Sequence, residues 1–133
     1  MTRKILIVDD DDIFADTLQT EFRAEGEQVV RAVDGEDGYN KALSELPDAI
    51  VLDVIMPKML GISVLERLKE DATTKFIPII VVSNFGGENN EKRALELGAS
   101  EFIVKTSTTP KQIADTVRKY FPSGGGISAK LTA

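Results

Sequence analysis

The stretch Ile5-Leu6-Ile7-Val8-Asp9-Asp10 decides the fold of this 133-residue chain. Four consecutive apolar residues followed by acidic ones are typical of a strand that is buried on both faces of a parallel sheet. Further short apolar runs follow at residues 29–33, 49–52, 79–82 and 102–104. We therefore expect five buried or half-buried strands, each followed by its own connecting segment.

The segments between these runs have the spacing of amphipathic helices. In the first segment Phe14, Leu18 and Phe22 fall on one stripe, and Gly26 is placed to end the helix. In the second, after a capping Asp34, one side carries Tyr39, Ala42, Leu43 and Leu46. The other helices are expected around residues 62–68, 88–97 and 110–121. The alternation predicts an α/β protein with a three-layer, doubly wound (βα)5 flavodoxin-like fold and a five-stranded parallel sheet.

Length and composition indicate one globular domain. The chain is 42% hydrophobic and 29% charged, which is ordinary for a folded protein of this size. We predict a domain over residues 1–122 and a flexible tail or linker stub over 123–133, because Ser123-Gly124-Gly125-Gly126 is too small and flexible to pack.

Composition also excludes several classes of function. The chain has no histidine and no cysteine, which removes His-based triads, zinc–thiolate sites and thiol nucleophiles. A net charge of −6 argues against direct binding to nucleic acid. No apolar run approaches the roughly 20 residues of a membrane span, and the N-terminus lacks the pattern of a signal peptide, so we expect a cytoplasmic location and no membrane partner.

Polar residues stand where four of the predicted strands end. Asp9 and Asp10 follow the first strand, Asp53 the third, Ser83 the fourth and Lys105 the fifth. Taken singly, each residue type is more typical of a turn, a helix cap or a solvated face. The carboxyl ends of parallel strands meet at one edge of the sheet, however, and ligands bind there. The sequence therefore predicts one polar site at this edge.

The chemistry of this set favours a metal and a phosphoryl group. Three neighbouring carboxylates repel one another unless a cation intervenes, and Lys105 supplies only one positive charge. Hard oxygen ligands without imidazole or thiolate favour Mg²⁺ or a similar ion such as Mn²⁺. Asp53, presented singly by the central strand, is the carboxylate best placed to act as a nucleophile.

These residues and their order resemble the receiver domains of two-component response regulators, particularly the single-domain chemotaxis type. The resemblance covers about the first 122 residues. The segments that carry it are Ile5–Asp10, Ile50–Pro57, Val81–Ser83 and Gly98–Lys105.

The resemblance implies a role for each site residue. Asp53 accepts the phosphoryl group, and Lys105 bridges it to the phosphoryl oxygens. Asp9, Asp10, Asp53 and the backbone carbonyl of Ile55 hold the metal. Ser83 and Phe102 act as the switch that responds to phosphorylation.

The resemblance also implies the partners. The phosphoryl donor is a sensor histidine kinase, a histidine phosphotransfer domain or a small phosphodonor. The surface formed by the helix near residues 88–97, the fifth strand and the last helix controls a downstream effector. The resemblance also allows a phosphorylation-dependent homodimer, in which the partner is a second copy of the chain. The chain is then no enzyme with external substrates, and catalyses only its own phosphorylation and dephosphorylation.

Four positions depart from the family pattern. Thr106 stands where relatives commonly have proline, and Leu60 where they have an acid. Ile55 and Phe85 are apolar where several relatives are polar. Because neither side chain can orient a water molecule, we predict slow self-dephosphorylation.

Three other functions remain as alternatives. An aspartyl phosphatase of the dehalogenase type needs a second acid at the position of Ile55. A flavin or nucleotide binder needs a phosphate-cradling loop where this chain has four aspartates. A degenerate receiver that serves only as a scaffold is opposed by the intact acids, Ser83 and Lys105, but Leu60 and Thr106 keep it open.

Overall fold

The computed structural model describes residues 2–54, 61–84 and 88–121. The predicted α/β fold is confirmed, with five parallel strands in the order β2-β1-β3-β4-β5, which is the flavodoxin-like order. The strands are β1 (Lys4–Val8), β2 (Gln28–Ala32), β3 (Ala49–Asp53), β4 (Ile79–Ser83) and β5 (Glu101–Val104). The helices are α1 (Asp12–Ala24), α2 (Gly35–Glu45), α3 (Gly61–Glu70), α4 (Glu88–Glu96) and α5 (Pro110–Arg118), with a 3₁₀ turn η1 (Lys105–Ser107).

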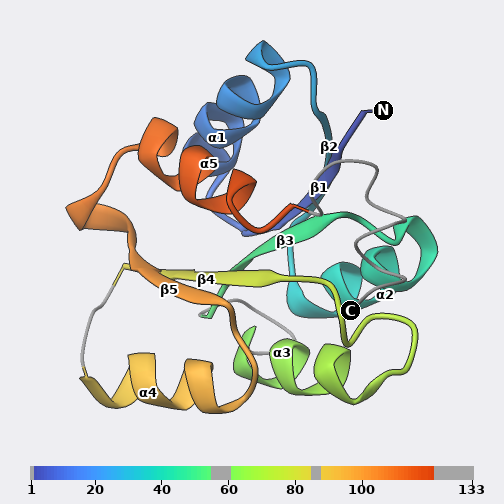
Figure 1. The fold of residues 1–133 in the computed structure, drawn as a ribbon. Helices are drawn as coiled ribbons and strands as arrows, with labels where there is room; N and C mark the ends of the chain where they lie inside the picture. The colour runs from blue at the N-terminus through green and yellow to red at the C-terminus, as the bar shows by residue number, and fades with distance from the viewer. Residues whose placement is uncertain (1, 55–60, 85–87, 122–133) are drawn as a thin grey trace.

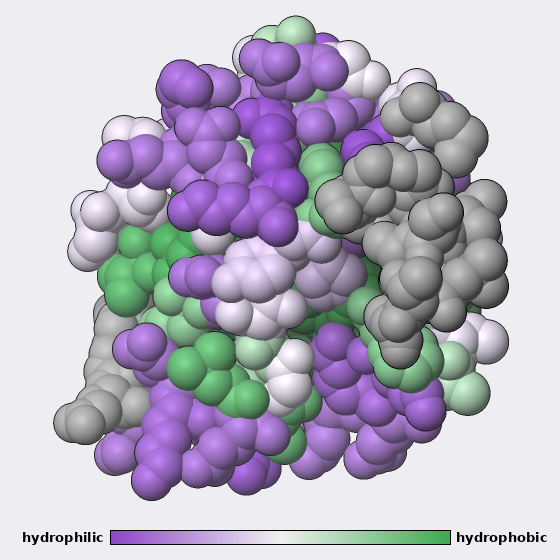
Figure 2. Space-filling model, in the orientation of Figure 1, coloured by the Kyte–Doolittle hydropathy of each residue, from purple (hydrophilic) through white to green (hydrophobic). Residues whose placement is uncertain are grey.

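The sheet is the middle of three layers. Helices α1 and α5 lie on one side of it and α2, α3 and α4 on the other, above and below the sheet in Figure 1. Side chains alternate between the two faces along each strand. In β1, for example, Leu6 packs into the core beneath α2–α4, whereas Ile5 and Ile7 pack into the core beneath α1 and α5. Figure 2 shows hydrophilic side chains over the outer surfaces of these helical layers.

Polar side chains cap the starts of three helices, including the predicted cap at Asp34. The side chain of Asp11 accepts a hydrogen bond from the N–H of Phe14 at the start of α1, and that of Asp34 accepts one from Asp37 at the start of α2. Thr109 forms a capping box with Gln112 at the start of α5. Gly26 has φ +83° after α1, so it ends that helix as expected.

Two details of the predicted helices are wrong. Leu46 does not belong to the buried stripe of α2, because it is the C-cap residue, has φ 45° and is 56% exposed. Helix α5 ends at Arg118, so Phe121 packs on the core from beyond the helix. The domain boundary at residue 122 and the tail 123–133 lie outside the described residues.

Candidate functional site

The carboxyl edge of the sheet collects the predicted site residues. Asp9 follows β1, Asp53 ends β3, Ser83 ends β4 and Lys105 follows β5. β1 and β3 are neighbours, but the chain continues from β1 to β2 on one side of this pair and from β3 to β4 on the other side. Their carboxyl ends therefore flank the switch point at which open α/β sheets bind ligands.

Three carboxylates meet at this point. One oxygen each from Asp9, Asp10 and Asp53 lies within 4.8 Å of the other two. Asp9 and Asp53 are buried, whereas Asp10 is exposed. Hard oxygen donors at this spacing, open to solvent on one side, fit a divalent cation that keeps some of its water.

Lys105 is the cation that the fold itself brings to these acids. Its Nζ lies 2.7 Å from Oδ2 of Asp9 and 3.7 Å from Oδ2 of Asp53, and its side chain is only 6% exposed. The ammonium also lies 4.3 Å from the centroid of the Phe14 ring, close enough for a cation–π contact. The sequence assigned Phe14 to the core stripe of α1, where it is only half-buried.

Asp9 is the acid whose ionisation the fold disfavours. Oδ1 accepts a hydrogen bond of 2.9 Å from the N–H of Asp11. Neither Oδ2 of Asp9 nor Nζ of Lys105 has a hydrogen bond of good geometry within the described part of the chain, despite their short separation. Burial raises the pKa of Asp9 above its ordinary value, although Lys105 and the N–H of Asp11 act in the opposite direction. A bound cation would therefore stabilise the ionised form of Asp9.

Arg31 is a residue of the site that the sequence prediction missed. The second strand carries none of the predicted site residues, but the guanidinium of Arg31 donates from Nη2 to the carbonyl oxygen of Asp9 at 2.9 Å. The same nitrogen lies 2.8 Å from Oδ1 of Asp12. The available signal was a single arginine within the otherwise apolar stretch 29–33.

Gly61 fixes the chain beside Asp53. Its N–H donates to the carbonyl oxygen of Val54 at 3.0 Å. A β-carbon at this position would overlap the backbone carbonyl of Asp53, so only glycine fits the approach of α3 to β3.

The predicted switch residues lie on the two strands next to this site. Ser83 is buried and pairs in register with Val104, directly before Lys105. Phe102 is half-buried and packs against the core beneath α2–α4. Thr106 lies within η1. Ile55, Leu60 and Phe85 lie outside the described residues.

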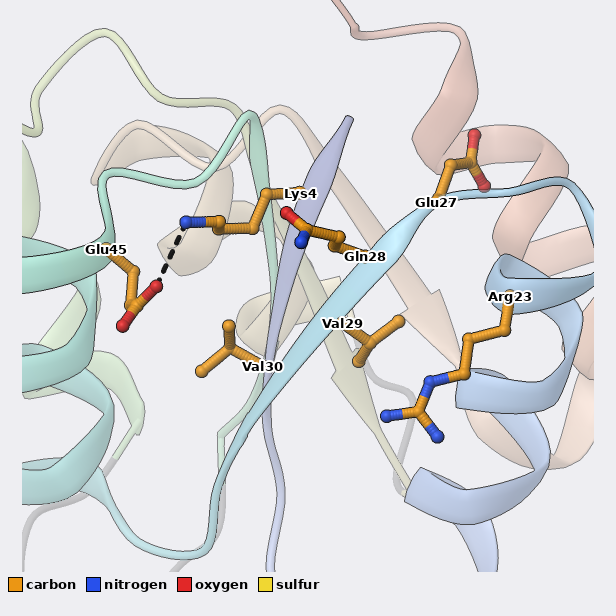
Figure 3. A pocket seen from close by; sticks show the side chains of 7 residues that line it. All are labelled: Lys4, Arg23, Glu27, Gln28, Val29, Val30 and Glu45. Atoms are coloured by element: carbon orange, nitrogen blue, oxygen red, sulfur yellow. Dashed lines mark hydrogen bonds and ion pairs between the residues drawn. The ribbon is translucent and has the colours of Figure 1, made fainter. Parts of the chain in front are cut away.

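The opposite edge of the sheet also carries charges, around a shallow hollow beside β2. Figure 3 shows Lys4 pointing toward Glu45, with Arg23 and Glu27 on the other side of β2. Lys4 and Glu45 are 3.0 Å apart and are both about one-third exposed. This hollow contains no carboxylate cluster among the residues shown, and we assign it no ligand.

Comparison with known proteins agrees with this geometry. Residues 5–118 match the family described as the response regulator receiver domain. Over 105 residues the chain is 39% identical to the response regulator PleD of Caulobacter vibrioides. These residues are 79% of this chain and 23% of PleD. It is 36% identical over 118 residues to the alkaline phosphatase synthesis transcriptional regulatory protein PhoP of Bacillus subtilis, which is 89% of this chain and 48% of PhoP. The chain thus spans less than half the length of either relative.

A solved structure agrees over a larger share of both chains. The chemotaxis response regulator CheY4 of Vibrio cholerae superposes with a TM-score of 0.83 at 25% identity, covering 91% of this chain and 100% of that one.

Proposed function

The chain belongs to the response regulator receiver domain family, and we propose that it is phosphorylated on Asp53 in a reaction that depends on Mg²⁺. Receiver domains are signalling domains rather than enzymes that turn over external substrates. The observation that carries the proposal is the meeting of three carboxylates and one buried ammonium at the switch point of the sheet.

The reaction is a phosphoryl transfer to a carboxylate. An oxygen of Asp53 attacks the phosphorus of the donor and forms an acyl phosphate. The bond from phosphorus to the donor's leaving atom breaks, and the leaving group keeps the electron pair. Because this sequence has no histidine, a phosphohistidine donor lies outside it; a small phosphate ester or anhydride can serve in its place.

Lys105 and the acids have separate tasks in this proposal. The Lys105 ammonium, 3.7 Å from Asp53, is placed to accept part of the negative charge of the incoming phosphoryl oxygens. Asp9, Asp10 and Asp53 would hold Mg²⁺, or Mn²⁺ in its place. The family resemblance adds the backbone carbonyl of Ile55 as a further ligand. When bound, the ion would neutralise part of the charge of the transferring phosphoryl group.

We further propose that phosphorylation changes the surface formed by α4, β5 and α5. Ser83 ends the strand next to β5 and would hydrogen-bond a phosphoryl oxygen. Phe102 lies on β5 and packs against the core beneath α2–α4. Its side chain has no hydroxyl that could form a hydrogen bond at the surface. An inward movement of its ring would alter this surface by packing alone.

The partners follow from this scheme. We propose a sensor histidine kinase or a histidine phosphotransfer domain as donor, and a downstream effector that binds the α4–β5–α5 surface in the cytoplasm, without direct contact to nucleic acid or membrane. Phosphorylation-dependent pairing of two copies through the same surface is tested by light scattering with and without beryllofluoride. Within the described ranges, none of the helices combines the length and apolar character that a bilayer span requires.

Intact-mass measurement tests the phosphorylation. Incubation with Mg²⁺ and acetyl phosphate is expected to add one phosphoryl group, and Asp53→Asn is expected to abolish the gain. The matched control is Asp48→Asn, because Asp48 lies at the opposite edge, where it accepts a hydrogen bond from the N–H of Lys4. Release of phosphate without a mass gain would instead favour the phosphatase alternative. No reaction at all would contradict the proposal.

The lifetime of the modification tests a second expectation. After removal of the donor, we expect the mass gain to decay slowly, because Ile55 and Phe85 offer no polar side chain to orient water. Loss of the phosphoryl group within seconds would contradict this expectation.

A further inference from the structure

We propose that Arg31 is a positioning residue for the cation site: its guanidinium holds the Asp9–Asp12 segment in the shape that presents Asp9 and Asp10 to a divalent ion. The inference rests on the proposed function, because it assigns Arg31 a role in the Mg²⁺ site of that reaction. It concerns β2, a strand that supplies none of the predicted metal ligands.

Both backbone groups of Asp9 are bound from β2. The N–H of Asp9 donates to the carbonyl oxygen of Ala32 at 3.0 Å. The carbonyl oxygen of Asp9 accepts from Nη2 of Arg31 at 2.9 Å and from Nε at 3.3 Å. These bonds hold the two peptide groups on either side of the Cα of Asp9, and they therefore fix the direction in which its side chain leaves the backbone.

Arg31 also holds the segment at its far end. Nη2 lies 2.8 Å from Oδ1 of Asp12, which is the first residue of α1. One guanidinium therefore spans the segment from the end of β1 to the start of α1. Asp10 and Asp11 lie between these two contacts.

Arg31 is mostly buried, and its backbone is held by α2. Its side chain is 17% exposed, compared with 79% for that of Asp12. Nζ of Lys41 on α2 donates to the carbonyl oxygen of Arg31 at 2.6 Å and to Oδ2 of Asp37 at 3.1 Å. Arginine suits this task because its rigid planar fork offers several donors in a fixed geometry, which a lysine ammonium does not.

Arg31 does not contact the carboxylate oxygens that face the cation site. In the contacts described for it, Arg31 binds the carbonyl of Asp9 and the carboxylate of Asp12, and not the carboxylates of Asp9, Asp10 or Asp53. Lys105, in contrast, lies 2.7 Å from Oδ2 of Asp9 and occupies the site itself. The two cations thus act differently: Lys105 faces the ligands, and Arg31 supports their backbone.

A positioning role and a pure charge effect of Arg31 predict opposite changes in Mg²⁺ affinity when Arg31 is replaced. Removing a positive charge near a cation site strengthens cation binding, if charge is all that the residue supplies. Removing a residue that orients the ligands weakens binding, typically about 10-fold for such outer contacts. The two roles therefore predict opposite changes in the Kd for Mg²⁺.

Isothermal titration calorimetry of Mg²⁺ into the full chain distinguishes the two roles. We expect the Arg31→Gln variant to bind Mg²⁺ about 10-fold more weakly than the unmodified chain, and Arg31→Lys, which keeps the charge, to fall between them. The matched control is Arg23→Gln, the same change at an exposed arginine beside the hollow of Figure 3, with an expected Kd within twofold of the unmodified value.

Circular dichroism of the metal-free proteins shows which variants are folded, and the comparison uses those. If Arg31→Gln fails to fold, Arg31→Lys carries the test, because it retains the charge but not the fork. A Kd equal to or below the unmodified value in a folded Arg31 variant overturns the inference. Absence of Mg²⁺ binding by the unmodified chain would instead contradict the proposed function.

Discussion

The two edges of the sheet use the same residue types in opposite ways. At the amino edge, where the strands begin, Lys4 pairs with Glu45 and Arg118 pairs with Glu27. In each pair a nitrogen of the cation lies about 3 Å from a carboxylate oxygen. At the carboxyl edge the single ammonium of Lys105 faces both Asp9 and Asp53, and Asp10 adds a third acid. The first arrangement is nearly neutral and partly solvated, and the second is acidic and mostly buried.

The difference shows which edge is built for stability and which for a ligand. Ion pairs with equal numbers of positive and negative groups, in contact with water, are stable without a bound ligand. Buried carboxylates in excess of cations are unfavourable unless a further cation compensates them. Asp9 is one of these acids, and its burial raises its pKa above the ordinary value. A fold tolerates such an excess where a bound cation compensates it.

The largest expected effect comes from removing the lysine at each edge. Lys105→Met leaves two buried carboxylates without their cation, so we expect the free energy of unfolding in EDTA to fall by about 3 kcal/mol. Lys4→Met breaks a partly exposed pair and is expected to cost about 0.5 kcal/mol. Urea denaturation of both variants measures the difference. Equal losses would mean that the two edges do not differ.

Mg²⁺ is expected to stabilise the protein through the carboxyl edge alone. At a concentration ten times its Kd, the ion should add about 1.4 kcal/mol to the free energy of unfolding. For a domain of this size that corresponds to a rise in melting temperature of about 5 °C. Thermal denaturation with Mg²⁺ against EDTA measures the shift, which Lys4→Met should retain. A shift absent from the unmodified chain would argue against a cation site.

Asp9→Asn is expected to stabilise the metal-free protein. Because the pKa of Asp9 is higher in the folded than in the unfolded state, ionising it lowers stability as pH rises from the unfolded-state value through the folded-state value. The neutral amide avoids that loss. We expect a gain of about 1 kcal/mol, the lower end of the cost of an unsatisfied buried polar atom. Urea denaturation at pH 7 would contradict this by showing a loss.

The smallest effect is expected from Glu45→Gln at the amino edge. Its partner Lys4 stays partly solvated, so the free energy of unfolding should change by less than about 0.5 kcal/mol. The stabilisation by Mg²⁺ should be the same as in the unmodified chain. A change in that stabilisation would show that the two edges are coupled.

The sequence was sufficient to predict most of the fold and the residues of the acidic cluster. The buried strands are short apolar runs that end in polar residues, and the caps at Asp11, Asp34 and Thr109 are local signals. Parallel strands then bring Asp9, Asp53 and Lys105 to one edge, because their carboxyl ends must meet there.

Contacts that depend on side-chain direction could not be predicted. Arg31 lies on an edge strand, where an arginine is most simply interpreted as facing solvent, and its reach to Asp9 depends on the β1–β2 register. Phe14 fits the apolar stripe of α1, and nothing in that spacing indicates a contact with Lys105. Leu46 continues the helical spacing of α2, but the left-handed C-cap turns it toward solvent.

Paramagnetic broadening by Mn²⁺ in an amide NMR spectrum tests the contrast between the edges most directly, since one titration observes both. We predict that substoichiometric Mn²⁺ selectively broadens signals of residues around Asp9, Asp10, Asp53 and Lys105, and leaves those of Lys4, Gln28 and Glu45 sharp. Broadening centred on Lys4 and Glu45, or uniform weak broadening across the spectrum, would contradict the claim that the acidic edge holds a divalent cation.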